Sequence, residues 1–347
     1  MNTSFNRFRM WHVLTALVLA SLAVASCEVE FTPNAEWKNV PVVYCVLDQD
    51  DDTSWVRLER CYLSSDGLFN YGSDPDSIHY DSAAVSVAVL AYSGETLRDS
   101  IPFSYTLRPR SEGQFASGLQ PAYFALTHGR LKEEYTYVLR VRNTADNSVL
   151  ASSKPISLIR TTQAQHIIKP SYTINMSGDT LGLFNFPDFV GGEACCKFEW
   201  VEMENARLYQ PVVRFFYVVE DTLKHLDLRC QRTSAHRYVH YPRQVFLDEI
   251  KARLQDDPRP KRYTKHVDVY LHACTEELNA YMESVSQGSA LDQNRAVYGN
   301  MDGGIGIFAA RRTHLYKPFP ADTTSARSAS NASFYPQLEA LGVGIYM

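Results

Sequence analysis

VPVVYCVLDQDDDTSWVRLERCYL, residues 40–63, is the stretch that decides the fold class. It holds two runs rich in Val, Leu and aromatic residues, Val40–Leu47 and Trp55–Leu63, on either side of the acidic segment Asp48–Asp52. In the second run apolar and charged residues alternate, which is the pattern of a strand with one buried face. The stretch therefore predicts a pair of adjacent strands joined by an acidic turn.

The same kind of pattern continues on the C-terminal side. Short runs of β-branched and aromatic residues are separated by turn sequences such as Ser93-Gly94 and Thr144–Ser148. The predicted strands are Ala84–Tyr92, Ile101–Leu107, Tyr123–Thr127, Tyr135–Arg142 and Val149–Ile156. Many short strands without intervening helices are typical of a sandwich. We therefore expect residues 40–157 to form an immunoglobulin- or transthyretin-like β-sandwich.

Beyond this region the pattern becomes mixed. Residues 158–170 lose it and form the predicted linker, and residues 171–316 are expected to form a β-rich α+β domain with one or two helices. Strands are predicted at Lys197–Val201, Val212–Val219, His266–His272 and Gly303–Ala310, and helices at Gln244–Gln255 and Thr275–Gln287. Residues 317–347 are rich in Pro, Ser and Ala and are expected to form an extended tail.

The N-terminus has the pattern of an exported lipoprotein. Basic residues precede an apolar run, Val13–Ala25, and Ser26 and Cys27 follow it. The run is shorter than the roughly 20 residues that a membrane span needs. We expect residues 1–26 to be a signal peptide, Cys27 to carry the lipid anchor, and residues 27–39 to be a tether. An ordinary secretory signal, with Cys27 left unmodified, is the alternative.

Composition limits the partners. The whole chain has a formal net charge of −5, and the predicted signal peptide carries Arg7 and Arg9 but no acidic residue, so the remainder is more acidic still. An acidic chain argues against nucleic acid as a partner, because phosphate backbones select clustered Lys and Arg. The 21 Tyr and 17 Phe residues suit pleated sheets, whose faces accommodate bulky side chains.

Two blocks of sequence resemble a known family. They comprise Phe198-Glu-Trp200, Asn205-Ala206, Tyr209 and Phe215–Tyr217, and then His266–Leu271, Tyr281, Tyr298–Asn300 and Gly303–Phe308. Their order resembles the Bacteroidota lipoproteins grouped as domain of unknown function 4249, although this chain has a longer tail past Tyr316. The resemblance implies an envelope lipoprotein, often encoded beside TonB-dependent outer-membrane transporters, and we expect the lipid anchor to lie in the outer membrane. It implies no activity and no functional residues.

The functional expectation follows from the anchor, the β-rich layout and the resemblance. The sequence holds no Gly-x-Ser-x-Gly, His-Glu-x-x-His or Walker-type loop. We expect a non-enzymatic binding or accessory module without a cofactor, working beside a TonB-dependent transporter on a ligand that the sequence does not identify. A structural or adhesive envelope component is the second hypothesis. A hydrolase whose site is assembled from scattered residues is the third.

One set of carboxylates imitates a metal-binding loop. Asp48, Asp50 and Asp52 alternate, and Glu59 follows at the spacing of a calcium loop. However, Thr53 occupies the position where such a loop requires glycine. A solvated acidic turn is the favoured interpretation.

Other motifs are weaker. Cys230, His236 and His240 form Cys-x5-His-x3-His, which could supply part of a zinc site but lacks a fourth ligand. The glycine pattern Gly304–Ala309 imitates a dinucleotide fingerprint, but it lies within a predicted strand rather than at the start of a helix.

The remaining cysteines are expected to be mainly structural. The adjacent Cys195 and Cys196 lack the Cys-x-x-Cys spacing of a redox pair. We expect at most one or two disulfides, and Cys45 with Cys61 is the pair that the sequence disfavours least, because the two flank one predicted pair of strands.

A repeated dipeptide suggests a modification. Asp followed by Ser or Thr, and then by a small or apolar residue, resembles the O-glycosylation acceptor of Bacteroidota envelope proteins. The hydroxyl residues are Ser77, Ser82, Ser100, Thr180, Thr222 and Thr323. The alternative is that these pairs are ordinary turn sequences.

Overall fold

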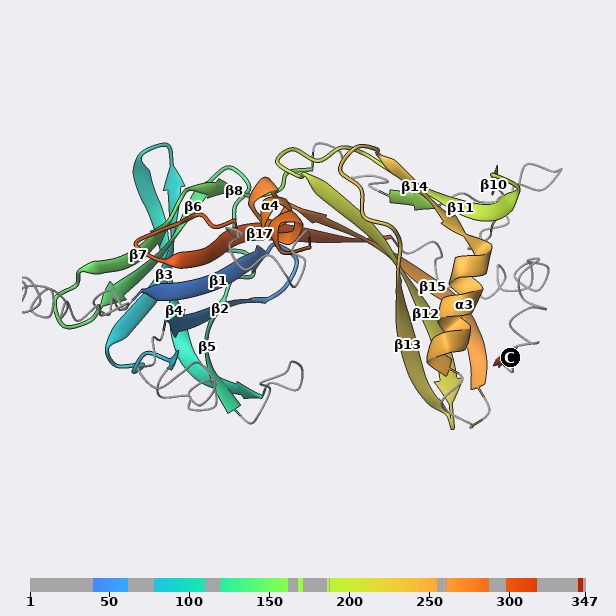
Figure 1. The fold of residues 1–347 in the computed structure, drawn as a ribbon, viewed down its shortest axis with the longest axis horizontal. Helices are drawn as coiled ribbons and strands as arrows, with labels where there is room; N and C mark the ends of the chain where they lie inside the picture. Colours follow the sequence, from blue (N-terminus) through green and yellow to red (C-terminus); the bar gives the residue numbers. More distant parts are fainter. Residues whose placement is uncertain are drawn as a thin grey trace, which may run out of the picture. The chain divides into compact units, whose positions relative to one another are not determined.

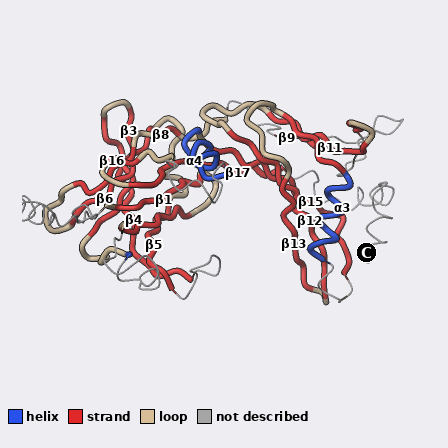
Figure 2. The backbone as a smooth tube through the Cα atoms, viewed as in Figure 1, coloured by secondary structure: helices blue, strands red, loops and turns tan. Residues whose placement is uncertain are grey.

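The computed structural model describes residues 40–61, 78–109, 119–161, 168–170, 186, 188–254, 259, 261–286, 298–316 and 343–345. Within these residues the protein is mainly β, with one large mixed sheet, a smaller sheet and two helices (Figures 1 and 2). The prediction of a mainly β chain with one or two helices is therefore confirmed. The predicted signal peptide and tether lie outside the described residues, as does the predicted tail except for residues 343–345.

The first half of the chain contains the predicted succession of short strands. They are β1 (Pro41–Asp48), β2 (Thr53–Arg60), β3 (Val85–Ser93), β4 (Thr96–Pro109), β5 (Leu119–Leu126), β6 (Thr136–Asn143), β7 (Val149–Ser153) and β8 (Ile156–Ser157). Strands β1 and β2 pair antiparallel across the acidic turn. The alternating apolar side chains of both strands are buried, including Val43 at 0% and Leu58 at 1% exposure.

Strand β4 pairs with two different strands that both contribute to the first hydrophobic core. Its first part pairs with β3, where Ile101 lies opposite Val89. Its second part pairs with β5, where Tyr105 lies opposite Tyr123. Ile101, Val89 and Tyr123 all belong to the same core cluster, so the strands on both sides of β4 enclose one apolar interior.

The second half packs two sheets and a helix around another core. Its elements are β9 (Ile168–Pro170), β10 (Asp188–Val190), β11 (Glu193–Trp200), β12 (Leu208–Val219), β13 (Thr222–Arg229), β14 (Tyr238–Pro242), α3 (Arg243–Leu254) and β15 (Lys261–Cys274). Strands β13, β12 and β15 belong to the large sheet, whereas β9, β10, β11 and β14 form the smaller one. Helix α3 buries Phe246 and Ile250 in a core to which residues of both sheets contribute.

Strand β17 (Ile305–Tyr316) connects the two halves within one sheet. Its first part pairs parallel with β1, and its last part pairs antiparallel with β15. Arg311 is the residue where the partners change, because it lies opposite both Asp48 and Cys274. Helix α4 (Glu276–Ser286) packs on β17, while β16 (Met301–Asp302) pairs with β7 and β18 (Val343–Ile345) pairs with β15.

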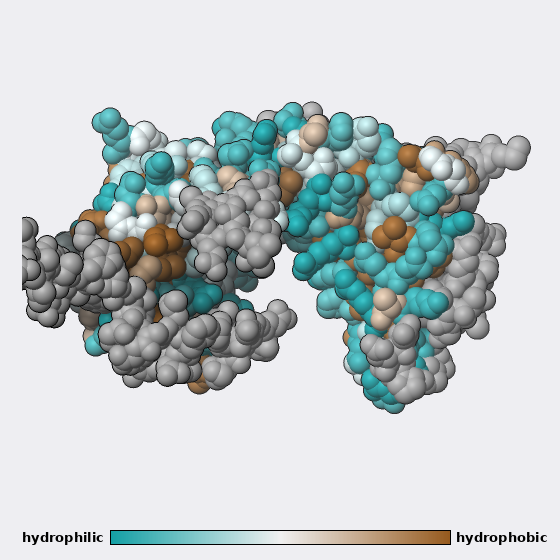
Figure 3. Space-filling model, viewed as in Figure 1, coloured by the Kyte–Doolittle hydropathy of each residue, from teal (hydrophilic) through white to brown (hydrophobic). Residues whose placement is uncertain are grey.

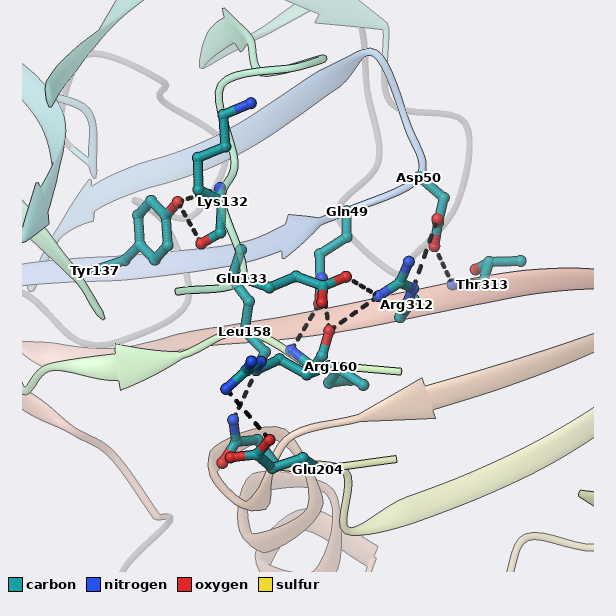
Figure 4. Close-up of polar contacts among 12 residues, drawn as sticks. Gln49, Asp50, Lys132, Glu133, Tyr137, Leu158, Arg160, Glu204, Arg312 and Thr313 are labelled. Atoms are coloured by element: carbon teal, nitrogen blue, oxygen red, sulfur yellow. Dashed lines mark hydrogen bonds and ion pairs between the residues drawn. The ribbon is translucent and has the colours of Figure 1, made fainter. Parts of the chain in front are cut away.

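The start of the predicted linker is buried between the two cores. Leu158 and Ile159 are both 0% exposed, and Leu158 packs in the first core whereas Ile159 packs in the second. The side chain of Gln49 accepts a hydrogen bond from the Ile159 N–H at 2.8 Å and donates one to its C=O at 2.9 Å (Figure 4). The division at residues 158–170 stays a prediction, but its first two residues are fixed core residues.

Contacts of Arg160 and Arg312 also hold this junction. Arg160 and Glu204 form a backbone bridge, and their side chains form an ion pair at 3.4 Å. Arg312 donates to the Ile159 C=O at 3.1 Å and also forms an ion pair with Glu133 (Figure 4). The chain therefore passes from one core to the other through a network of specific polar contacts.

Candidate binding site

A polar pocket of about 470 Å³ lies in the first half of the chain. It is built from the end of β2, the turn before β3, the second part of β4, and β5. Its lining residues are Arg60, His79, Tyr80, Asp81, Ser82, Tyr105 and Pro121. The volume is at the small end of the range of roughly 300–1,000 Å³ that is typical of small-molecule sites. We take this pocket as the candidate binding site.

The segment before β3, which supplies four of the lining residues, ends in a turn that the Asp81 side chain stabilises. Asp81 accepts a hydrogen bond from the Ala83 N–H through Oδ1 at 2.9 Å, and its backbone C=O accepts one from the Ala84 N–H at 2.9 Å. The Thr144 hydroxyl donates to the Ala83 C=O at 2.6 Å from the connection between β6 and β7. Aspartate stabilises turns in this way. Asp81 and Ser82 are therefore held at the pocket by the fold.

Strands β4 and β5 form an aromatic wall. Their pairing places Tyr105 opposite Tyr123 and Leu107 opposite Pro121. The rings of Tyr105 and Tyr123 meet edge to face, with centroids 5.7 Å apart and an interplanar angle of 75°. Tyr105 is 40% exposed, whereas Tyr123 is 3% exposed. The buried ring supports the exposed one, so that Tyr105 presents aromatic surface at the pocket.

The formal charges at the pocket balance. Arg60 is cationic and Asp81 is anionic. Burial lowers the pKa of His79, and Arg57 and Arg60 act in the same direction, against Glu59 and a hydrogen bond to the Leu58 backbone. Burial also raises the pKa of Tyr80 to about 12, with Arg60 opposing it. At neutral pH His79 and Tyr80 are therefore uncharged.

Two buried polar atoms at and behind the pocket wall have no hydrogen-bond partner among the residues that the structure describes. They are Nδ1 of His79, which is 7% exposed, and the hydroxyl of Tyr123. Since Leu58 engages the other imidazole nitrogen, Nδ1 of the neutral ring is an acceptor. Leaving such a buried group unpaired costs about 1–3 kcal/mol. Unpaired buried groups are rare in native proteins, and those that occur often have a functional reason.

The pocket brings together the residue types of a hydrolytic triad, but not their geometry. A triad needs a hydroxyl bonded to one imidazole nitrogen and a carboxylate bonded to the other. In the described part of the chain, the His79 ring bonds to the Leu58 backbone and leaves Nδ1 without a partner. Asp81 directs Oδ1 to the Ala83 N–H. The arrangement suits binding through hydrogen bonds and ring contacts.

The structure does not bring the calcium candidates together. Glu59 lies opposite Val42, six residues along β1 from Asp48, which corresponds to about 20 Å. Asp48 is buried and paired with Arg311 at 2.5 Å. Asp50 accepts a hydrogen bond from the Thr313 N–H at 2.6 Å, and the exposed Asp52 lies 3.1 Å from His128. The acidic turn is therefore tied to β17 by two of its carboxylates rather than being wholly solvated.

The zinc candidates are also separated. Cys230 is 3% exposed and belongs to the second core. The ring of Tyr238 lies between His236 and His240, with centroids 5.4 Å from each. No group of three His, Cys, Asp or Glu side chains that could hold a metal ion occurs within the described ranges.

The six described cysteines are free thiols. The suggested Cys45–Cys61 pair is wrong, because Cys45 lies opposite Val56 and Cys61 follows five residues later, about 17 Å along the strand. Cys196 packs in the second core, and burial raises the pKa of its neighbour Cys195. A raised pKa keeps a thiol protonated and unreactive, which agrees with a structural role.

Half of the predicted glycosylation residues lie in the described part of the chain. Ser82, Ser100 and Thr222 are all exposed. Ser77, Thr180 and Thr323 lie outside it, as does the predicted lipid-bearing Cys27. None of the described helices is both long and apolar enough to cross a membrane.

The comparisons with known proteins identify a family. A family model described as Domain of unknown function (DUF4249) matches residues 28–315, a span that includes every lining residue of the pocket. A search of curated proteins finds no match. Sequence reasoning singled out only Ser82 of the lining residues, and for a different role. The signal was absent because the pocket combines one short segment, residues 79–82, with single residues from three strands that are distant in the sequence.

Proposed function

Since this chain belongs to the family described as Domain of unknown function (DUF4249), we propose that it is an outer-membrane lipoprotein that binds a small polar ligand. It acts without catalysis, as an accessory module beside a TonB-dependent transporter. The observation that carries the binding role is the pocket, in which Arg60, Asp81 and Tyr105 combine both charges with an exposed ring. A few convergent polar groups beside aromatic surface are typical of ligand sites.

The proposed anchor is lipid on Cys27. The apolar run that precedes this residue supports export, and two or three acyl chains hold a protein on a membrane almost permanently, at roughly 0.8 kcal/mol per buried methylene. In this proposal residues 1–26 are removed and residues 27–39 tether the folded part.

The finer description of the fold belongs to the same proposal. The strands that enclose the first core would form an immunoglobulin- or transthyretin-like sandwich, followed by a β-rich α+β domain. The support is the antiparallel pairing of β3 to β7 around one core and the packing of helix α3 in the second.

A structural or adhesive envelope component is the second candidate. Such a protein would contact its partner through a broad surface rather than through a small pocket. In the view of Figure 3, the described surface is mostly hydrophilic and its hydrophobic residues form separate patches. The defined pocket favours the ligand-binding candidate.

The location and the partner can be tested together in the native host. Tagged full-length protein is compared with Cys27→Ala by membrane fractionation, palmitate labelling and detergent copurification. We expect the wild type to be labelled, to fractionate with the outer membrane and to copurify with a TonB-dependent barrel. Cys27→Ala should be unlabelled and should leave the outer-membrane fraction, because the lipid supplies the attachment.

Cys61→Ala is the matched control, because Cys61 is a half-buried free thiol that the proposal does not use. It should behave as the wild type. Equal membrane retention of Cys27→Ala without label would contradict the anchor, and copurification without any barrel protein would contradict the partner.

Peptide mass spectrometry of the same native sample tests the proposed glycosylation. It measures whether the hydroxyl residues of the six Asp-Ser and Asp-Thr pairs are modified, and six unmodified residues would contradict the glycosylation hypothesis.

A further inference from the structure

We propose that the pocket lined by Arg60, Asp81, Ser82 and Tyr105 binds a neutral saccharide unit of one or two rings. This inference rests on the proposed binding role and adds the chemical class of the ligand. Three properties of the pocket carry it: its balanced charge, its exposed ring and its supply of hydrogen-bonding groups.

Balanced charge selects a ligand without net charge. Arg60 and Asp81 line the same cavity, and their formal charges cancel. A purely anionic ligand would meet the Asp81 carboxylate, and a purely cationic ligand would meet the Arg60 guanidinium. Either encounter is repulsive at close range. A neutral ligand avoids both repulsions.

The exposed ring selects a ligand with a flat C–H face. Tyr105 is 40% exposed and is fixed edge-on by the buried ring of Tyr123 at 5.7 Å. An aromatic ring offers a large apolar surface with little conformational freedom to lose on binding. Pro121 adds a second rigid apolar group to the lining. Sugar rings present C–H groups on a face and hydroxyls around the edge, which matches a ring next to polar groups.

The polar lining matches the hydroxyls. The Arg60 guanidinium has five N–H donors in a planar fork, and the Asp81 carboxylate retains acceptor capacity beyond the bond from Ala83 to its Oδ1. The exposed Ser82 hydroxyl can donate and accept. Nδ1 of His79 is an acceptor without a partner among the residues described. Neighbouring sugar hydroxyls, each a donor and an acceptor, can satisfy such a mixed set.

The volume limits the size of the ligand. A cavity of about 470 Å³ belongs to the lower part of the range for small-molecule pockets. One or two sugar rings fit such a cavity, whereas a longer glycan would have to extend beyond it.

The proposal can be tested on full-length protein in detergent micelles. Binding is measured by isothermal titration calorimetry and saturation-transfer NMR. The neutral sugars in the panel are glucose, galactose, N-acetylglucosamine, maltose and lactose. Glucuronate, glucosamine and the zwitterion glycylglycine complete the panel. We expect at least one neutral sugar to bind, with saturation transferred from the protein to its ring C–H protons. The charged sugars should bind more weakly or not at all.

Two variants report on the pocket itself. Tyr105→Ala should weaken sugar binding about tenfold or more, as expected for the loss of one ring contact. Tyr238→Ala is the matched control, because Tyr238 is also 40% exposed but lies on β14, away from the pocket lining. The affinity of this variant for the sugar should equal that of the wild type. Asp81→Asn keeps the acceptor for Ala83 and removes the charge. The Asp81→Asn variant should bind the neutral sugar more weakly and should allow glucuronate to bind. A merely structural role of Asp81 would not produce this reversal of preference.

The outcomes separate this inference from the proposed function. Binding of glycylglycine or a charged sugar with no neutral sugar would overturn the saccharide class but leave the binding role standing. Equal loss of affinity in Tyr105→Ala and Tyr238→Ala would also overturn it. If no member of the panel binds while a barrel protein still copurifies from the native host, the saccharide inference fails and the accessory role is retained.

Discussion

Gly306 on β17 lies opposite Val43 on β1. Its φ is +117°, and a Cβ atom added there would lie 2.0 Å from the backbone oxygen of Val43. Both facts exclude a side chain, because the conformation is disfavoured for L-residues and the obstacle is backbone. The glycines that imitate a dinucleotide fingerprint therefore serve the close pairing of two strands.

Replacement of Gly306 should be severely destabilising. We expect Gly306→Ala to lower the free energy of unfolding by about 3 kcal/mol or more, from backbone strain and steric overlap together. Gly94→Ala is the comparison, since its φ is +59° and no atom lies within 4 Å of the added Cβ. That variant should lose only about 1–2 kcal/mol, the cost of a left-handed residue. Urea denaturation followed by circular dichroism measures both.

Equal effects of the two alanines would show that the contact with Val43 does not matter.

Residue-level patterns predicted the core better than they predicted the pocket. The alternation of Val267, Val269 and Leu271 correctly identified buried positions, because a strand places every second side chain on one face. Arg60 and Tyr105 gave no such signal. Their roles depend on strand pairing and on the turn at Asp81, which join residues that are distant in the sequence.

At the scale of elements, strands with simple alternation were predicted and those with mixed faces were missed. Strand β3 and helix α4 lie within a residue of their predicted ranges. Strand β13 was not predicted, because the exposed Leu223 breaks the alternation that Leu226 and Leu228 would otherwise give. The last part of β17 was missed because Arg311 to His314 is polar, although β15 pairs with it.

The junction between the cores predicts a measurable role for Gln49. Its side-chain amide is the hydrogen-bond partner of both backbone groups of the buried Ile159. Gln49→Ala should lower the free energy of unfolding by about 1–3 kcal/mol, because the buried Ile159 N–H loses its acceptor. Amide hydrogen exchange should report faster exchange at Ile159. The control is Gln244→Ala, which removes an exposed bond to Asp248 and should change stability by less than about 0.5 kcal/mol.

Unchanged exchange at Ile159 in Gln49→Ala would mean that this side chain does not hold the junction closed.

For the whole molecule, three histidines make stability depend on pH. Burial is the main cause of a lowered pKa at His79, His272 and His314, with arginines acting in the same direction at each. The folded state therefore binds fewer protons than the unfolded state just below the ordinary histidine pKa of about 6.5. Stability should fall as the pH decreases through this value and should be fully present above it.

Denaturant midpoints between pH 7.5 and pH 5.5 test this dependence. Each of His79→Gln, His272→Gln and His314→Gln should flatten the profile, because each removes one group that takes up a proton only on unfolding. Burial raises the pKa of Asp50 and Glu249, which contributes in the opposite direction. The comparison of single variants with the wild type therefore isolates the histidines. Profiles that keep the wild-type slope in all three variants would contradict the assignment.

The parallel pairing of β1 with β17 sets the order in which this protein can be completed. Asp48 and Arg311 are 263 positions apart, so one of the first strands to be synthesised must wait for one of the last. Until then one edge of β1 lacks the neighbour that covers it in the finished molecule, and an uncovered edge is a site for wrong pairing. Distant pairings also slow folding. A chain of this design would benefit from a chaperone that shields β1 until β17 is available to pair with it.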